Sequence, residues 1–340
     1  MMANRKSIEK VSKDEKLIEK VASILQARSV KSLDIAKKLI LSEKVECKEI
    51  NEAFKYYAEN WNDYLHPGLI SLACEAVNGD PEKSIPIQVA MLLLTAAFDI
   101  HDDIIDESKT KYGKPTLFSK FGKDVALLVG DAFLMKALTL LHKLKKQFSA
   151  KKVNAIWDTI NSQFFELGDA EALESSLKGN VGVSPEKCFH ILEKKASSFE
   201  VHMRIGAIIG DGKQSEIDLL GDYGRALGIL TSIREDFIDI FEPDELQNRM
   251  KKELLPLPIL HALKNSQARK TIIGTLSKPK ISGKDAEKIV DIVFEERSVK
   301  IFRQEIQQLA EKTLKEISGI NNYDIKSLMK VLVNGVLEDL

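Results

Sequence analysis

The chain has 340 residues, 44% of them hydrophobic, and a formal net charge of −1. This length allows a large core in one domain or two, and the near balance of charge gives no reason to expect binding to nucleic acid or attraction to a membrane surface. Cys47, Cys74 and Cys188 show neither disulfide nor metal-ligand spacing and are typical of small buried side chains in a reducing compartment. The apolar stretch over residues 85–98 is too short to cross a bilayer, so we expect a cytoplasmic protein.

Helical periodicity dominates the chain, and strand-like alternation is almost absent. Near the C-terminal end, for example, apolar residues recur at helical spacing through Ile301, Ile306 and Leu309. The pattern predicts an all-α protein of long helices joined by short turns. We divide it into an N-terminal helical segment, 1–55, that is partly mobile, and a helical domain, 56–340.

Two loops are predicted inside the helical domain. Residues 179–185 read Gly-Asn-Val-Gly-Val-Ser-Pro, with Ser184 as the N-cap of the next helix. Residues 278–283 form the second loop. Neither resembles a long linker between domains.

An apolar helix predicted from Ile87 runs into four aspartates. At about 100° per residue, all four project from one face of that helix. They are Asp99, Asp102, Asp103 and Asp106. Carboxylates that share a stripe repel one another, and Mg²⁺ held by one or two carboxylates is completed by water and phosphate oxygens. The cluster therefore predicts a metal-diphosphate site, with a solvated acidic helix end as the alternative.

A second acidic cluster repeats this spacing. Glu235, Asp236 and Asp239 lie within another apolar run, residues 223–241. Two such helices could face each other across one pocket. The two clusters together favour a metal site over two solvated helix ends.

Cationic side chains follow each of the two clusters in the sequence, and two more lie between them. A leaving diphosphate develops charge that metal ions, lysine and arginine must absorb. The candidates are Lys111, Lys194, Lys195, Arg249, Lys251 and Lys252. For any one of them alone, an ordinary surface charge is the simpler interpretation.

These motifs resemble the trans-isoprenyl diphosphate synthases, also called polyprenyl synthetases, over roughly residues 61–263. His101-Asp-Asp-Ile-Ile-Asp106 is similar to the family's first aspartate-rich motif. Further matches are Gly113-Lys-Pro-Thr116, Phe121-Gly-Lys123, Leu128-Val-Gly-Asp-Ala-Phe-Leu134, Tyr223-Gly-Arg-Ala-Leu-Gly228 and Leu255-Pro-Leu-Pro-Ile-Leu260.

The resemblance implies a fold and a reaction. The fold is a single-domain antiparallel bundle of long helices around a deep apolar pocket. The reaction uses three Mg²⁺ ions to remove the diphosphate of an allylic prenyl substrate, after which the allylic cation alkylates isopentenyl diphosphate. By resemblance the metal ligands are Asp102, Asp103, Asp106, Glu235, Asp236 and Asp239, and the catalytic residues are Asp102, Asp103, Asp106, Lys194 and Asp236. The substrate-binding residues are Lys111, Lys194, Lys195, Arg249, Lys252, Phe98, Asp99 and His66.

The chain departs from the family where isopentenyl diphosphate binds. Where the family has Gly-Lys-x-x-Arg-Pro, Asp63 replaces the lysine and His66 the arginine. Leu94 stands at the family's histidine, Lys111 and Tyr112 at its paired arginines, and Thr231-Ser232 at its Phe-Gln pair. Losing several contacts of about 1.5–3 kcal/mol each would abolish useful diphosphate affinity. We therefore expect an atypical member with a degenerate isopentenyl diphosphate site. In the second metal motif, separately, Glu235 stands at an aspartate, which changes the reach to the metal.

Two residues near the first motif have open roles. Asp99 stands where the family has an apolar residue, and a buried carboxylate is costly unless it is paired. It would act on the substrate or pair structurally with Lys194 or Lys195. Phe98 is bulky and would cap the prenyl chain or pack into the core.

Three functions follow from the resemblance. The first is a prenyltransferase that uses an allylic diphosphate with isopentenyl diphosphate bound unusually, or with another acceptor. The second is a class I terpene cyclase-like lyase. The third is a non-catalytic subunit that tunes a related synthase, which two retained acidic motifs disfavour. We expect a homodimer, or a heteromer with a related synthase. The sequence does not separate acceptors, cyclic from linear products, or chain lengths.

Overall fold

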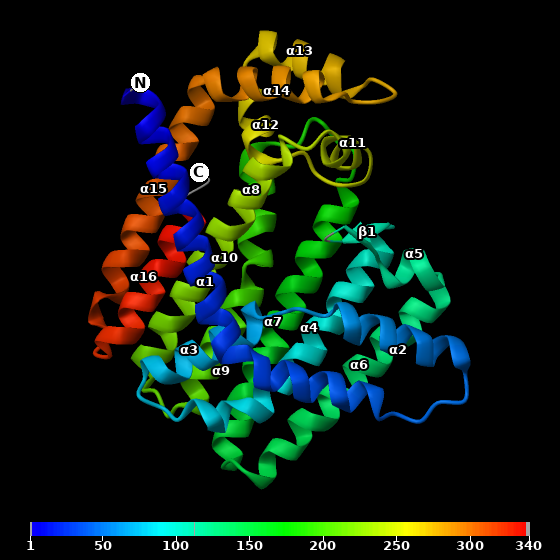
Figure 1. Cartoon of the computed structure of the whole chain (residues 1–340), viewed down its shortest axis with the longest axis vertical. Helices are drawn as coiled ribbons and strands as arrows, with labels where there is room; N and C mark the ends of the chain where they lie inside the picture. Colours follow the sequence, from blue (N-terminus) through cyan, green and yellow to red (C-terminus); the bar gives the residue numbers. More distant parts are fainter. Residues whose placement is uncertain (1, 112, 338–340) are drawn as a thin grey trace. The chain divides into compact units, whose positions relative to one another are not determined.

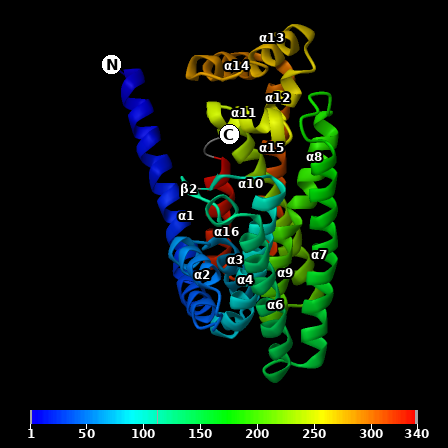
Figure 2. The ribbon, with the colours of Figure 1, turned by 90° about the vertical axis from the view of Figure 1, so that its right-hand side faces the viewer.

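A computed structural model describes the backbone of residues 2–111 and 113–337 and the side chains of residues 19–111 and 113–337. Helices make up almost all of it, as Figures 1 and 2 show, which confirms the all-α class. The strands β1 (Thr110–Lys111) and β2 (Lys114–Pro115) form one short antiparallel hairpin.

The helices of the first half of the chain begin and end as follows: α1 (Met2–Leu41), α2 (Lys48–Asn60), α3 (Leu65–Ala76), η1 (Pro81–Ser84), α4 (Ile85–Ile105), α5 (Leu117–Phe121), α6 (Lys123–Lys143), η2 (Leu144–Lys146) and α7 (Ala150–Ser176).

The second half contains α8 (Pro185–Lys195), α9 (Ser197–Ile209), α10 (Gln214–Asp239), α11 (Pro243–Lys252), α12 (Leu257–Ala262), α13 (Ser266–Leu276), α14 (Gly283–Glu295), α15 (Arg297–Glu316), η3 (Ile317–Gly319) and α16 (Tyr323–Leu337). Both predicted loops are confirmed. Ser184 accepts a hydrogen bond from the N–H of Lys187 at 3.2 Å, and Ser282 and Asp285 form a capping box at the start of α14.

The helices gather into two compact units. One comprises residues 1–18, 160–201 and 218–340, and the other comprises residues 19–159 and 202–217. The expected boundary at residue 55 falls within the second of these. The division into 1–55 and 56–340 therefore stays a prediction.

In the unit of residues 19–159 and 202–217, α4 is the core helix. Leu92, Leu93 and Ala97 are completely buried, and the helix packs mainly on α6. α3 approaches α9 equally closely, since a β-carbon on Gly206 would lie 2.2 Å from the carbonyl oxygen of Ile70. Small residues at these crossings let the helix backbones come together.

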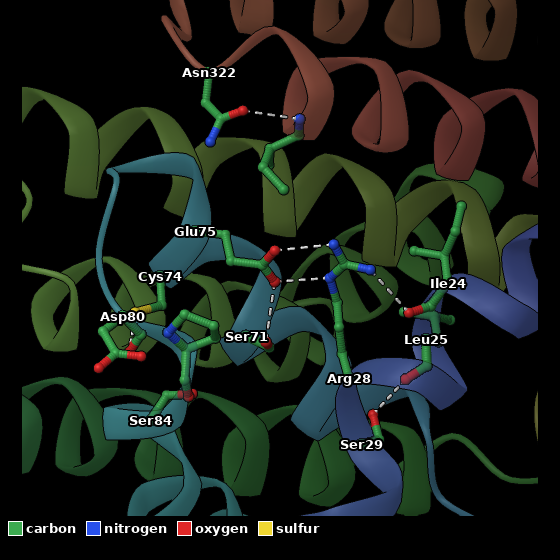
Figure 3. A network of polar contacts seen from close by, with 12 residues as sticks. Ile24, Leu25, Arg28, Ser29, Ser71, Cys74, Glu75, Asp80, Ser84 and Asn322 are labelled. Carbon is green, nitrogen blue, oxygen red and sulfur yellow. Dashed lines mark hydrogen bonds and ion pairs between the residues drawn. The ribbon is translucent and has the colours of Figure 1, made fainter.

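An ion pair fixes α1 against α3 in this unit, as Figure 3 shows. Arg28 donates from Nε and Nη2 to the two carboxylate oxygens of Glu75, at 2.8 and 3.0 Å, and Ser71 donates to the same carboxylate at 3.1 Å. Such bidentate geometry is directional as well as favourable. The pair therefore constrains the position of α1 on α3 in addition to the apolar contacts between the two helices.

In the other unit, α10 carries the core. Tyr223 is fully buried and donates its hydroxyl to the carbonyl of Met329 on α16 at 2.9 Å. Phe237 stacks on Phe302 of α15 with ring centroids 6.2 Å apart. α10 thus packs on α16 before the second acidic cluster and on α15 within it.

Two helical stretches, residues 81–105 and 123–146, have the length and composition to cross a membrane. The apolar stretch 85–98 is too short to cross a membrane by itself, but the helix that contains it continues to Ile105 and is long enough. Within the first stretch, 67% of the most apolar 18-residue window is buried inside the protein, which accounts for its apolar character. Among the cysteines, Cys74 and Cys188 are buried as expected, whereas Cys47 is exposed, which corrects that prediction.

Candidate active site

The first acidic cluster lies at the C-terminal end of α4. Asp99, Asp102 and Asp103 are on its last two turns, and Asp106 is the C-cap, where its N–H donates to the carbonyl of Asp102 at 2.9 Å. The next residue, Glu107, has a φ of 52°, which stops the helix. The end of the helix therefore falls within the acidic motif.

Burial of Asp103 makes a negative charge at this position costly. It raises the pKa of Asp103 to about 6, Lys111 opposes the rise, and the charges of Asp99 and Asp106 add to it. The carboxylates of Asp99 and Asp106 thus disfavour ionisation of Asp103. A divalent cation would relieve that repulsion.

Lys111 is part of the first cluster. It lies on β1, and its Nζ is 3.5 Å from Oδ1 of Asp99. The expected pairing of Asp99 with Lys194 or Lys195 is thereby corrected, because β1 turns back toward the end of α4. The expectation that the carboxylate of Asp99 is buried is also wrong, since 52% of its side chain is exposed.

Two residues support the first cluster that the sequence analysis did not assign. Nε2 of His101, which directly precedes Asp102, lies 3.3 Å from Oδ1 of Asp131 on α6. A β-carbon on the neighbouring Gly130 would lie 2.5 Å from the same nitrogen. In the sequence, Gly130 and Asp131 stood out only as part of the segment Leu128–Leu134 that resembles the family. The packing of α6 on α4 is what places them beside His101.

The second acidic cluster ends α10. Glu235 is exposed, Asp236 is 6% exposed, and Asp239 is the last residue of the helix. Asp236 accepts a hydrogen bond through Oδ2 from the backbone N–H of Leu257 at 2.9 Å. Burial raises the pKa of Asp236 to about 6, although Arg249 and that N–H act against the rise.

Arg249 of α11 points into the second cluster. Its Nη2 lies 2.5 Å from Oδ2 of Asp239 and 3.3 Å from Oδ1 of Asp236. The structure therefore gives Arg249 two carboxylate partners in this cluster, and its predicted contact with diphosphate stays a prediction.

The lysines of α8 are paired with acids of α7. Nζ of Lys194 lies 2.8 Å from Oδ2 of Asp169. Lys195 contacts Glu171 at 3.0 Å and also Glu174. Lys252 is the last residue of α11 and is half-buried. The predicted contacts of these lysines with diphosphate stay predictions.

The substituted positions form a polar cluster of their own. Asp63 accepts from the backbone N–H groups of Leu65 and His66, both at 3.1 Å, so it caps α3. Its other oxygen lies 2.9 Å from Nδ1 of His66. His66 packs on the buried His202 with ring centroids 4.7 Å apart, and Nε2 of His202 lies 3.5 Å from the hydroxyl of Thr95.

Charges within this polar cluster balance one another. Burial opposes ionisation of Asp63, but His66 outweighs it and lowers the pKa of that carboxyl. Burial likewise opposes the charge on His66, but Asp63 and Asp99 raise the pKa of the imidazole. Leu94 is buried, and Tyr112 lies outside the described residues. His202 was missed, because it lies 136 positions after His66 in the chain and only folding brings the two together.

Comparison with known proteins decides the family. Residues 47–295 match the family model for polyprenyl synthetases. The chain belongs to the polyprenyl synthetase family. That range contains both acidic clusters and the polar cluster around Asp63.

Curated relatives are about a quarter identical to this chain over the aligned residues. It is 27% identical to a geranylgeranyl diphosphate synthase of Methanosarcina mazei over 205 residues, which cover 60% of this chain and 63% of that one. It is also 27% identical to the large subunit of a heterodimeric geranylgeranyl pyrophosphate synthase of Arabidopsis thaliana, over 72% and 70% of the two chains. The matched part thus spans roughly two thirds of the length of these relatives.

Solved structures of the family confirm the fold. The geranylgeranyl pyrophosphate synthetase of Pyrococcus horikoshii superposes with a TM-score of 0.82 at 21% identity, over 96% of this chain and 99% of that one. A polyprenyl synthetase of Streptomyces coelicolor gives 0.80 at 20% identity, over 93% and 99%. At this identity the likeness concerns the fold alone.

The first cluster of this chain has the donor chemistry that Mg²⁺ requires, because it consists of carboxylate oxygens, and a cation there would relieve the repulsion that Asp99 and Asp106 exert on Asp103. Within residues 19–111 and 113–337, no three His, Cys, Asp or Glu side chains are arranged to hold a metal ion by themselves. Mg²⁺ needs only one or two carboxylates when water and phosphate oxygens complete its shell. The second cluster differs, since its aspartates already hold a guanidinium.

Proposed function

We propose that the chain is a Mg²⁺-dependent prenyltransferase of isoprenoid biosynthesis that ionises an allylic, all-trans prenyl diphosphate. The observation that carries the proposal is the stripe of closely spaced aspartates at the end of α4, where burial and the neighbouring carboxylates raise the pKa of Asp103, within a polyprenyl synthetase chain. Relatives named as geranylgeranyl and farnesyl diphosphate synthases support it.

Each part of the first cluster has a role in this proposal. Asp102, Asp103 and Asp106 would hold Mg²⁺, which neutralises the diphosphate so that it can leave. Lys111 would turn from Asp99 toward the same anion. Breaking the Lys111–Asp99 pair costs little, because an ion pair that is 3.5 Å apart and partly exposed is weak. Glu235, Asp236 and Asp239 are the second proposed set of ligands, and three ions the proposed number.

The acceptor is the less usual part of the proposal. Asp63 and His66 form a hydrogen-bonded pair of opposite charge at the two positions where the family pattern has lysine and arginine. A second diphosphate would have to bind without them. We therefore propose either isopentenyl diphosphate held unusually, with low affinity, or an acceptor without a diphosphate.

A second chain is also part of the proposal. The exposed side chains of α6 include Leu127, Leu128 and Met135, at 43%, 59% and 63% exposure. Leu128 and Met135 are seven residues apart and share one face of the helix. Such an exposed apolar face supports association, as a homodimer or with a related synthase, and one relative is named as a subunit of a heterodimer. A cytoplasmic location remains our proposal from cysteine usage.

Product analysis tests the function. Purified protein would be incubated with Mg²⁺ and allylic diphosphates of graded length, with and without isopentenyl diphosphate, and the products identified by mass spectrometry. Longer prenyl diphosphates would support elongation, and diphosphate release with a new adduct would support another acceptor. Cyclic hydrocarbons formed from the allylic substrate alone would favour a cyclase instead. No diphosphate release with any substrate would contradict the proposal.

A further inference from the structure

Arg249 is surrounded by the carboxylates of the second acidic cluster and of its own helix. Its Nη2 contacts Asp239 at 2.5 Å and Asp236 at 3.3 Å. Its Nε lies 3.3 Å from Oε2 of Glu253 and 3.7 Å from Oε1 of Glu245. Only 18% of the side chain is exposed. One guanidinium thus serves four carboxylates in a largely buried site.

The surroundings fix this arrangement from several sides. Oδ2 of Asp236 is held by the backbone N–H of Leu257, so the carboxylate has little freedom to turn. Glu253 accepts from the side-chain amide of Asn248 at 2.6 Å, and its carbonyl accepts from the N–H of Gly179 at 3.2 Å. Two of the carboxylates that contact the guanidinium are therefore themselves held in place by hydrogen bonds.

A divalent cation would need the same oxygens. A close guanidinium competes with Mg²⁺ or Mn²⁺ for these carboxylate oxygens and also repels the metal. Asp236 and Asp239 fit a metal poorly as the chain is folded. Without Arg249, however, four neighbouring acids would lose the guanidinium that they share.

We infer that Arg249 is the resident cation of the second acidic cluster and that it excludes divalent metal from this cluster in the ligand-free protein. The inference concerns metal binding and holds whether or not the protein transfers a prenyl group. Its failure is thus distinct from failure of the proposed function.

The test is a titration with Mn²⁺ alone, read by the electron paramagnetic resonance of the free ion. Arg249→Met should gain one Mn²⁺ equivalent over the wild type, or bind Mn²⁺ about tenfold more tightly. Mn²⁺ should also raise the Tm of the variant more than that of the wild type. Arg28→Met is the matched control, because it removes another buried arginine but leaves one carboxylate, Glu75, without its arginine. It should lose stability and gain no Mn²⁺.

A second comparison does not depend on the folding of Arg249→Met. In the wild-type background, Asp239→Asn should leave Mn²⁺ binding unchanged, whereas Asp103→Asn should weaken it. Loss of a Mn²⁺ equivalent in Asp239→Asn would overturn the inference. Equal number and affinity of Mn²⁺ sites in the wild type and folded Arg249→Met would overturn it as well.

Discussion

Gly130 of α6 lies against the imidazole of His101 so closely that a β-carbon at residue 130 would be 2.5 Å from Nε2. His101 directly precedes Asp102, and Asp131 lies 3.3 Å from the same nitrogen. The close α4–α6 crossing therefore fixes the turn of α4 that begins the first acidic cluster.

Gly130→Ala tests this coupling. The added methyl group must push the ring of His101 aside, so we expect a loss of about 1–3 kcal/mol in the free energy of unfolding and weaker binding of Mg²⁺ with diphosphate. Gly168→Ala is the control, because nothing lies within 4 Å of a β-carbon there. It should be neutral or stabilising by about 0.5–1 kcal/mol. Urea unfolding measures both, and equal effects of the two changes would show that the contact is unimportant.

Asp103→Asn should slow diphosphate release by about 10²- to 10³-fold, because it removes a proposed metal ligand. Its Tm at pH 7 should stay the same or rise, since burial disfavours the charged form of this carboxyl. Asp124→Asn on the exposed start of α6 is the control and should leave diphosphate release unchanged. Undiminished diphosphate release in a folded Asp103→Asn protein would remove the metal assignment.

The acceptor site can be restored toward the family pattern by four changes, Asp63→Lys, His66→Arg, Leu94→His and Tyr112→Arg. Together they should raise incorporation of labelled isopentenyl diphosphate by orders of magnitude, because donors replace a balanced ion pair. Asp63→Lys alone should instead destabilise the fold by about 1–2 kcal/mol, since it removes the cap of α3 and the partner of His66. Vigorous incorporation by the unchanged protein would contradict our account of this site.

The Asp63–His66 pair predicts a pH dependence of stability. The raised pKa of His66 gives a contribution that is complete below its ordinary value of 6.5 and is lost as pH rises through the folded-state value. The lowered pKa of Asp63 gives one that is complete above 3.8 and is lost as pH falls through its folded-state value. His202, Asp99 and Lys111 also act on the pair but do not change these signs.

Wild type should therefore exceed His66→Gln most in the free energy of unfolding near pH 5.5, by about 1–2 kcal/mol. The difference should shrink toward pH 9. Urea unfolding at several pH values measures it, with Lys111→Gln as a control for the neighbouring charge. A difference that stays constant from pH 5.5 to 9 would mean that the pair is not ionised as described.

Phe98 offers a test of chain length. It is half-buried on α4, one turn before Asp102, whereas Ala97 is completely buried. If its ring limits the prenyl chain, Phe98→Ala should accept or form a longer prenyl diphosphate, which mass spectrometry would detect. Leu94→Ala, which empties a buried position one turn earlier, is the control for a general loosening of α4. An unchanged length distribution in Phe98→Ala would place the limit elsewhere.

The sequence by itself determined what depends on local spacing. Apolar periodicity predicted the helical class, and Ser184 predicted the start of α8 because an N-cap acts within three residues of itself. The two acidic clusters were also visible, since residues three and four apart share a helix face.

Only the tertiary structure decided how these charges are balanced. The partner of Asp99 is Lys111, because the β1–β2 hairpin turns back on the end of α4. Arg249 enters the second cluster through the turn between α10 and α11, and His202 reaches His66 from a distant helix. Ion pairing depends on distance in space, and a sequence gives the candidates for such pairs without the packing that selects among them.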